Sequence, residues 1–292
     1  MKFIEKILNS LVHRSGILIE VRNLIKKMNI DLDEELFIKN CEKFRKQIIK
    51  MSLGVPLKMI GKSNLDGSYP IYIYENMKAI KVISIGVGNN IRFDEEIANL
   101  GATVWTFDHT VAPRIKRKFK NKIYYFPYGI KGSKFIPNCK SLSEILNLSN
   151  NLDLFDKTIL KMDCEGAEWD VFSHNSIKTL AKFDQIIVEL HDLEKIGSSK
   201  YSKLYLSSLK KLESNFFVSY IAPNNFTPIV QLKNGMNWPF TLEIHFINKN
   251  LIKNLNTDQF KPGIIDEIYK IKNHWHLASK VDLSGWYRQT FK

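Results

Sequence analysis

The sequence predicts an α/β domain built on a parallel β-sheet, and three observations support this prediction. Apolar, β-branched runs alternate with helical segments between residue 79 and about residue 248. The runs are apolar almost throughout, as expected of strands that helices cover on both faces. Glycine and polar residues follow the runs at the edge where open α/β sheets bind ligands. The pattern therefore indicates a sheet that binds a ligand at the carboxyl ends of its strands.

The expected elements follow in order along the chain. Residues 1–52 carry apolar residues at the three- and four-residue spacing of helices, and residues 54–74 have the glycines and prolines of a connection. Helices are expected at 93–101 and around 201–214, and residues 250–292 are expected to form a helical tail. The expected strands are 81–86, 102–108, 121–127, 158–163, 183–191, 216–222 and 241–248.

The bulk composition limits the class of protein. With 292 residues, 44% of them hydrophobic, the chain can form one large α/β domain with an appendage. Its apolar runs are too short for a membrane span, and its N-terminus has neither the apolar region nor the cleavage site of a signal peptide. The three cysteines form no C-x-x-C pair, which favours the reducing cytoplasm.

The formal net charge of +13 has two explanations. One is attraction to nucleic acid, anionic lipid or a phosphorylated substrate. The other is codon usage, because Lys, Asn and Ile are frequent whereas Arg, the residue typical of phosphate recognition, is scarce. We favour the second and expect a solvated surface in place of a nucleic-acid site. The basic segment RIKRKFKNK at 114–122 nevertheless suits an anionic substrate.

A glycine bend follows the first predicted strand. Gly86 and Gly88 lack a Cβ, so a ligand can approach the backbone closely. Asp108 ends the second strand twenty residues later, where a carboxylate can bind the two hydroxyls of a ribose. A dinucleotide site needs a third glycine, and Ile91 occupies that position. S-adenosylmethionine has no pyrophosphate and carries a sulfonium cation that favours carboxylates, so we expect it in place of NAD. The predicted cofactor-binding residues are Gly86, Gly88, Asn89, Asp108, Tyr128, Gly129 and Asp163.

Four acidic residues lie in DCEGAEWD, the segment after the fourth predicted strand. Asp163 ends the strand beside the cofactor, and we expect catalytic roles for Asp163 and Glu165. Glu165 and Glu168 are expected in the helical turn that follows, where the helix N-terminus stabilises acidic residues. That stabilisation is the role we expect for Asp170.

His191 ends the fifth predicted strand, two residues after Glu189, so the two side chains share a face. A histidine has an ordinary pKa of about 6.5, which suits a general base for a hydroxyl acceptor. Two alternatives remain. Hydrogen bonds at the strand end can give His191 a purely structural role, or Asp163, Glu189 and His191 can together bind Mg²⁺ or Mn²⁺ and lower the pKa of the acceptor hydroxyl.

Three segments together resemble the FkbM-type S-adenosylmethionine-dependent methyltransferases: SIGVGNNIRFDEEIANLGATVWTFD, LKMDCEGAEWDVF and QIIVELH. The resemblance covers about residues 65–248, and D-x-E-G-A-E is its most specific motif. It implies a Rossmann-like class I methyltransferase sheet of seven strands, mostly parallel, with the last strand antiparallel. Gly86 and Gly88 match the cofactor glycines of the family, and Asn90 replaces the usual third glycine. The implied divisions are a helical segment and linker (1–64), the methyltransferase domain (65–250) and a helical tail (251–292).

The resemblance also implies the reaction, because members of the family mostly methylate oxygen atoms of sugars, glycans or other metabolites. We expect an O-methyltransferase acting on a carbohydrate, a glycan precursor or a related anionic metabolite, phosphorylated acceptors included. The alternatives are an RNA methyltransferase that uses the basic 114–122 segment, and an NAD-dependent or non-enzymatic protein on a similar sheet. The N-terminal helices are expected to cover the acceptor site or to form a homodimer.

Overall fold

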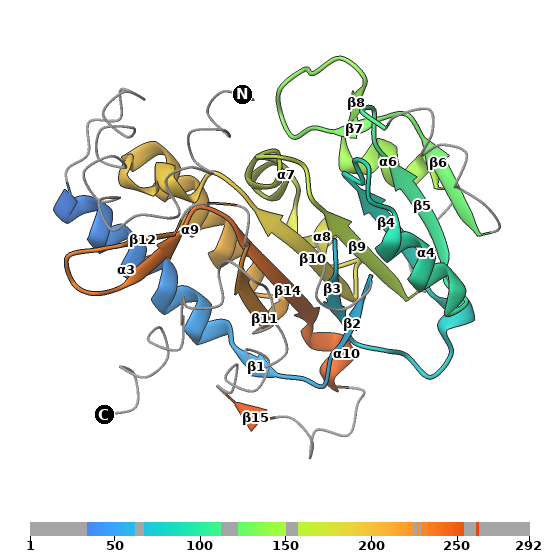
Figure 1. The fold of residues 1–292 in the computed structure, drawn as a ribbon, viewed down its shortest axis with the longest axis horizontal. Helices are drawn as coiled ribbons and strands as arrows, with labels where there is room; N and C mark the ends of the chain where they lie inside the picture. The colour runs from blue at the N-terminus through green and yellow to red at the C-terminus, as the bar shows by residue number, and fades with distance from the viewer. Residues whose placement is uncertain are drawn as a thin grey trace.

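The computed structural model describes residues 34–61, 67–111, 122–149, 157–224, 227, 229–253 and 261–262, and the statements below concern these residues. A seven-stranded sheet with the order β11-β14-β10-β9-β4-β5-β6 forms the centre of the fold (Figure 1). Its strands are β4 (Lys81–Ile85), β5 (Thr103–Phe107), β6 (Ile123–Phe126), β9 (Thr158–Met162), β10 (Gln185–Leu190), β11 (Phe216–Pro223) and β14 (Leu242–Asn248).

The sheet has the seven strands and the antiparallel last strand that the family resemblance implies. The last strand, β14, lies between β10 and β11 and is antiparallel to both, whereas the other strands run parallel to one another. Every residue of β9 and β10 is buried, as expected of central strands that are covered on both faces. All seven expected strands are present, and their ends agree with the prediction within two residues.

Helices cover both faces of the sheet and create two hydrophobic cores. One core includes Phe44, Trp169 and Leu209 and lies against α3, α7 and α9, whereas the other includes Ile97 and lies against α4. The expected helix at 93–101 is α4, and the expected helix around 201–214 is α9. The helices are α3 (Glu34–Met51), α4 (Arg92–Asn99), α6 (Leu142–Leu148), α7 (Glu168–His174), α8 (Ile177–Leu180), α9 (Ser199–Glu213), α10 (Lys249–Lys253) and the 3₁₀ helices η1 (Met77–Ala79) and η2 (Leu193–Gly197).

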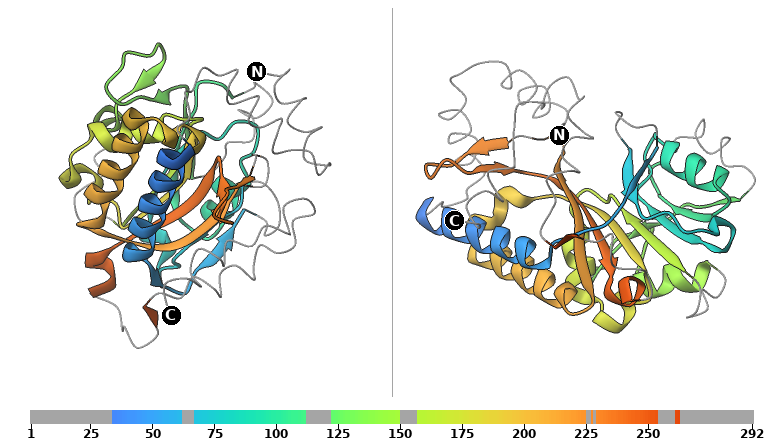
Figure 2. Two further views of the ribbon diagram at one scale, coloured as in Figure 1. Left: turned by 90° about the vertical axis from the view of Figure 1, so that its left-hand side faces the viewer. Right: turned by 90° about the horizontal axis from the view of Figure 1, so that it is seen from below.

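The helix α3 belongs to the main core, although the sequence predicts an appendage there. It buries Phe37, Cys41, Phe44 and Ile48 at helical spacing, and it packs beside α9 and η2 (Figure 2). The Phe44 ring lies edge-on to Trp169 and Trp238, with ring centres 6.1 Å and 5.5 Å away. The expected helical character of residues 1–52 is therefore confirmed for 34–51, and residues 1–33 lie outside the described part.

Four pairs of short strands lie outside the main sheet. The segment expected as a connection contains an antiparallel hairpin of β2 (Lys58–Ile60) and β3 (Tyr69–Ile71), which brings Tyr69 to the carboxyl edge of the sheet. The expected helical tail begins as a helix, α10, but its other described residues pair with β1 as a strand. The remaining pairs are β1 (Leu53–Gly54) with β15 (Lys261–Pro262), β7 (Gly129–Ile130) with β8 (Cys139–Lys140), and β12 (Ile229–Gln231) with β13 (Asn237–Pro239). Among the described helices, none has the length and apolar character that a membrane span requires.

Candidate active site

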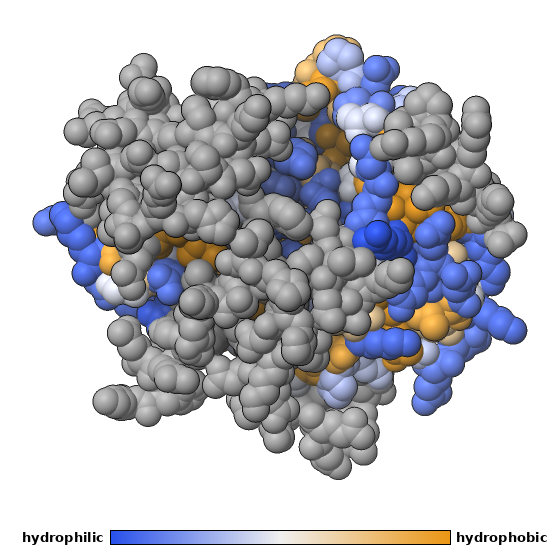
Figure 3. Space-filling view, in the orientation of Figure 1, coloured by the Kyte–Doolittle hydropathy of each residue, from blue (hydrophilic) through white to orange (hydrophobic). Residues whose placement is uncertain are grey.

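A cavity of about 470 Å³ lies at the carboxyl edge of the sheet, and its size is typical of small-molecule sites. Figure 3 shows hydrophilic side chains in a hollow near the centre of this face. The structure brings six of the seven predicted cofactor residues into the cavity wall: Gly86, Gly88, Asn89, Asp108, Gly129 and Asp163. Tyr128 does not line the cavity. Its ring lies 5.1 Å from the ammonium nitrogen of Lys140 and packs against the main core.

The two glycines of the bend have different roles. Both have positive φ angles, +76° for Gly86 and +57° for Gly88. A Cβ at Gly86 would overlap the carbonyl oxygen of Asp163, so this glycine allows the ends of β4 and β9 to meet. A Cβ at Gly88 would meet no atom within 4 Å. Gly88 therefore fits the predicted approach of a ligand to the backbone, whereas Gly86 is needed for packing.

Asp108 organises the glycine bend. Its Oδ2 accepts hydrogen bonds from the backbone nitrogens of Val87 (2.9 Å) and Gly88 (2.7 Å), and its Oδ1 accepts from the nitrogen and hydroxyl of Thr110, each at 2.6 Å. Burial favours a raised pKa, but these hydrogen bonds lower the pKa of Asp108 below its ordinary value. The carboxylate thus has a donor at each of its four acceptor positions. The ribose contact expected from the sequence stays a prediction.

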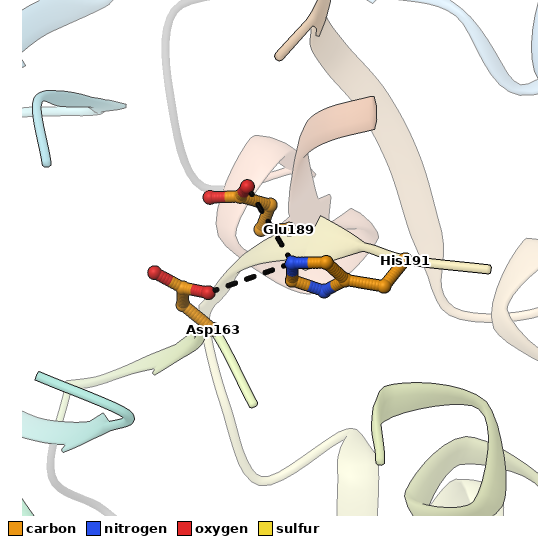
Figure 4. A group of neighbouring side chains, drawn as sticks. All are labelled: Asp163, Glu189 and His191. Carbon is orange, nitrogen blue, oxygen red and sulfur yellow. Dashed lines mark ion pairs between the residues drawn. The ribbon is translucent and has the colours of Figure 1, made fainter. Parts of the chain in front are cut away.

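Asp163 connects the cavity with His191. Its Oδ2 accepts a hydrogen bond from the Tyr69 hydroxyl at 3.1 Å and lies 3.7 Å from the ammonium of Lys161. Its other oxygen, Oδ1, lies 3.9 Å from Nε2 of His191 (Figure 4). One carboxylate therefore faces the cavity on one side and the imidazole on the other.

The D-x-E-G-A-E segment forms a tight turn and not the first turn of a helix. The helix α7 begins at Glu168, and Glu165 lies before it in the left-handed region, with a φ of +53°. The prediction that Glu165 lies in the helical turn is therefore wrong. Glu168 is completely buried, and it accepts hydrogen bonds from the nitrogens of Cys164 (2.7 Å) and Gly166 (3.0 Å). The last acid of the motif thus stabilises the turn that presents Asp163 and Glu165.

Asp170 has a structural role, although not only the one expected from the helix N-terminus. It lies in the first turn of α7, and its carboxylate accepts hydrogen bonds from the nitrogen and hydroxyl of Ser133, each at 3.0 Å. Ser133 belongs to the loop after β7, whose residues Gly129 and Ile130 line the cavity. Asp170 therefore ties this cavity wall to α7.

His191 lies among four carboxylates. Its Nδ1 is 3.1 Å from Glu168, and its Nε2 lies 3.6 Å from Glu189, 3.7 Å from Glu165 and 3.9 Å from Asp163. Burial favours a lower pKa, but the hydrogen bond and charge of Glu168, with the charges of Glu189 and Asp163, raise the pKa of His191 to about 10. In this arrangement His191 is protonated at neutral pH, which the sequence-based expectation of an ordinary general base did not foresee.

Glu189 completes the cluster on the side of β14. It is buried, it accepts a hydrogen bond from the Asn224 side chain, and it lies opposite Glu243 in the strand register. Burial raises the pKa of Glu189 well above its ordinary value, and the charges of Asp163 and Glu243 raise it further. Glu189 is therefore protonated more readily than an exposed carboxyl group.

The three predicted metal ligands converge, and a divalent ion bound by them stays a prediction. Among the described residues, Asp163, Glu189 and His191 offer ligand atoms within 4.8 Å of one another. Ligands on a Mg²⁺ ion at about 2.1 Å are separated by roughly 3 to 4 Å, which agrees with the distances around Nε2. Two carboxylates suit a hard cation, and the imidazole must lose its proton to bind it.

Three site residues were missed by the sequence-based prediction: Tyr69, Lys161 and Glu168. Lys161 had a visible signal, because it is the one charged residue in the apolar run TILKM of β9. Glu168 was recognised only as an acid near a helix start, and its burial depends on the packing of α7. Tyr69 reaches the site through the β2–β3 hairpin, which the glycines and prolines around it did not indicate.

Comparison with known proteins identifies a family. The family model described as the methyltransferase FkbM domain matches residues 62–214. A search among curated proteins found no significant match. Among solved structures, fibrillarin from Methanococcus jannaschii, a pre-rRNA processing protein, aligns at 12% identity and a TM-score of 0.34, covering 70% of this chain and 73% of that chain. The plantazolicin methyltransferase BpumL, solved in complex with SAH, aligns at 11% identity and a TM-score of 0.29, covering 84% and 94%.

Proposed function

The chain belongs to the FkbM family of S-adenosylmethionine-dependent methyltransferases, and on that premise we propose that it methylates a hydroxyl group of a carbohydrate, a glycan precursor or a related metabolite. The single observation that supports the proposal best is the position of Asp163. This residue lines the cavity and faces His191 on its other side, so it lies where a methyl donor and a hydroxyl acceptor have to meet.

The cavity has the chemistry that the donor requires. S-adenosylmethionine supplies an activated methyl group on a sulfonium cation, and Asp163 and Glu165 place negative charge at the cavity wall. Gly88 leaves room for close approach to the backbone, and Asp108 fixes the conformation of the bend. These residues bind and orient the donor, and such alignment can contribute about 7–11 kcal/mol to the reduction of the barrier.

The acceptor hydroxyl loses its proton during the transfer, and His191 is the residue proposed to receive it. Glu168 accepts a hydrogen bond from Nδ1, so the other nitrogen, Nε2, which faces Asp163, Glu165 and Glu189, is the one proposed to receive the proton. His191 must first be deprotonated. A cation bound beside Asp163 favours this, because it lowers the pKa of a neighbouring imidazole. A general base of this kind contributes about 10²–10⁴-fold in rate.

A metal-assisted form of the same reaction is the second candidate, and the convergence of Asp163, Glu189 and His191 supports it. A divalent ion there would lower the pKa of the acceptor hydroxyl. Titration of the chain with Mn²⁺ tests this, followed by electron paramagnetic resonance, with Glu189→Gln as the variant. Stoichiometric binding that Glu189→Gln abolishes supports the metal, and no binding at millimolar Mn²⁺ removes it.

Calorimetry with S-adenosylhomocysteine and with NAD tests the proposed cofactor. We expect micromolar binding of S-adenosylhomocysteine and none of NAD, and binding of NAD alone would falsify the proposal.

The basic segment proposed for an RNA acceptor lies outside the described residues, apart from Lys122. Binding to RNA that weakens steeply with salt would favour that alternative over a carbohydrate acceptor.

A further inference from the structure

The cavity wall contains one buried cation whose role neither the family match nor the proposed mechanism explains. Lys161 lies in the central strand β9, and only 4% of its surface is exposed. Of the residues that the structure describes, Lys161 is the only lysine or arginine that lines the cavity. The acidic residues in the same wall are Asp94, Asp108, Asp163 and Glu165. A buried lysine is costly unless its charge is compensated, and here the neighbouring acids Asp94 and Asp163 compensate it.

The contacts of Lys161 hold its ammonium group at the bend. The nitrogen Nζ donates a hydrogen bond to the carbonyl oxygen of Gly86 at 2.6 Å and lies 5.2 Å from the centre of the Tyr69 ring. It also lies 3.7 Å from Oδ2 of Asp163, which is longer than a hydrogen bond. An ammonium group has three N–H donors, so these contacts leave capacity for an anionic ligand in the cavity.

We propose that Lys161 binds the α-carboxylate of the methyl donor. This assignment rests on the proposed function, because it requires that the cavity binds S-adenosylmethionine. The donor carries one anionic group, the carboxylate of its amino-acid moiety. Each of the four acidic residues in the wall would repel that carboxylate. Beside Lys161 the carboxylate gains a charge-assisted hydrogen bond.

The assignment determines the direction in which the donor lies. Lys161 and Asp163 are two residues apart at the end of β9, and their side chains lie on the same side of the sheet. A donor held by its carboxylate at Lys161 therefore has its sulfur near Asp163, and its adenosine extends past Gly88 toward Asp108 and Gly129. Lys161 is thus a binding residue that positions the methyl group and selects donors with an intact amino-acid moiety.

The test compares two ligands that differ in the amino-acid moiety that carries the proposed contact. S-adenosylhomocysteine has the amino-acid moiety, whereas 5′-methylthioadenosine keeps the adenosine and the sulfur but lacks the carboxylate. In Lys161→Met, we expect calorimetry to show S-adenosylhomocysteine binding about 10- to 100-fold more weakly, the effect of losing a charged hydrogen bond. The affinity for 5′-methylthioadenosine should change by less than about twofold. The control is Lys157→Met, whose ammonium lies over the ring of Tyr74, and neither affinity should change there.

Each other outcome contradicts the assignment. An equal loss of affinity for both ligands in Lys161→Met would mean that Lys161 acts only by holding the carbonyl of Gly86. An unchanged affinity for S-adenosylhomocysteine would mean that Lys161 makes no contact with the carboxylate of the ligand. If Lys161→Met does not fold, the wild-type chain decides the question. Its affinity for decarboxylated S-adenosylhomocysteine should be at least tenfold lower than for S-adenosylhomocysteine, and equal or tighter binding overturns the assignment. A wild-type chain that binds neither S-adenosylhomocysteine nor S-adenosylmethionine would overturn the proposed function itself.

Discussion

Replacement of Glu168 by glutamine tests the architecture of the site, because it changes one oxygen of a completely buried carboxylate with almost no change in shape. Glu168 accepts hydrogen bonds from the backbone nitrogens of Cys164 (2.7 Å) and Gly166 (3.0 Å), and its Oε1 also lies 3.1 Å from Nδ1 of His191. An amide has only one acceptor oxygen, so in Glu168→Gln one backbone N–H faces an NH₂ group. The negative charge beside protonated His191 is lost as well.

The expected loss of stability follows from these contacts. A buried N–H group left without an acceptor costs about 1–3 kcal/mol, and breaking a buried charge pair costs about 3–5 kcal/mol in total. We therefore expect Glu168→Gln to lower the free energy of unfolding by about 3–5 kcal/mol. Glu165→Gln is the matched control in the same motif. The side chain of Glu165 is 86% exposed, so its change should stay within about 0.5 kcal/mol.

Urea unfolding measures both variants, and equal slopes show that the midpoints report stability. The pKa of His191, followed by nuclear magnetic resonance, should fall in Glu168→Gln because Glu168 makes the largest contribution that raises it. If Glu168→Gln is no less stable than Glu165→Gln and the pKa of His191 does not change, Glu168 does not hold the turn and the imidazole, and the reasoning is refuted.

Three further predictions concern other parts of the site and the core. Because the pKa of His191 is raised to about 10, its role as base predicts that kcat/KM for the donor rises with pH from 7 toward 10, and a flat profile contradicts it. Gly86→Ala should lower the free energy of unfolding strongly by overlap with the carbonyl of Asp163, whereas Gly88→Ala should cost much less stability and mainly weaken cofactor binding; equal losses of stability in urea unfolding would contradict this difference. Burial lowers the pKa of His245 to about 3, so it stays neutral when folded while the unfolded chain takes up a proton below pH 6.5. His245 should therefore contribute a loss of stability of about 1.4 kcal/mol per pH unit below 6.5, and His245→Gln should remove this contribution in denaturant titrations.

The strands that could be predicted from the sequence are those whose apolar residues reflect burial on both faces of the sheet. Strands β9 and β10 are covered on both faces, so their apolar runs identify them and their ends mark the ligand edge. The antiparallel direction of β14 followed only from the family resemblance, and its position between β10 and β11 was not predicted, because a strand's sequence does not specify its neighbours. The β2–β3 hairpin was missed because Pro70 lies within β3, and prolines are typical of connections and strand edges.

The site was predictable to the extent that it consists of residues at strand ends. Asp108, Asp163 and Glu189 follow apolar runs, and parallel strands bring their carboxyl ends to one edge. The protonation of His191 was not predictable, because it depends on carboxylates that three separate elements bring around one ring. The burial of Glu168 likewise depends on how α7 packs under its own turn. The sequence pattern thus identifies the residues that meet at the site, whereas their protonation states depend on the tertiary packing around them.

A crystal structure of the chain with bound S-adenosylhomocysteine tests the central claim most directly. We expect the ligand to fill the cavity at the carboxyl edge, with its sulfur beside Asp163, its carboxylate at Lys161 and its adenosine toward Asp108 and Gly129. A ligand bound elsewhere, or bound with its adenosine at Lys161, would contradict it.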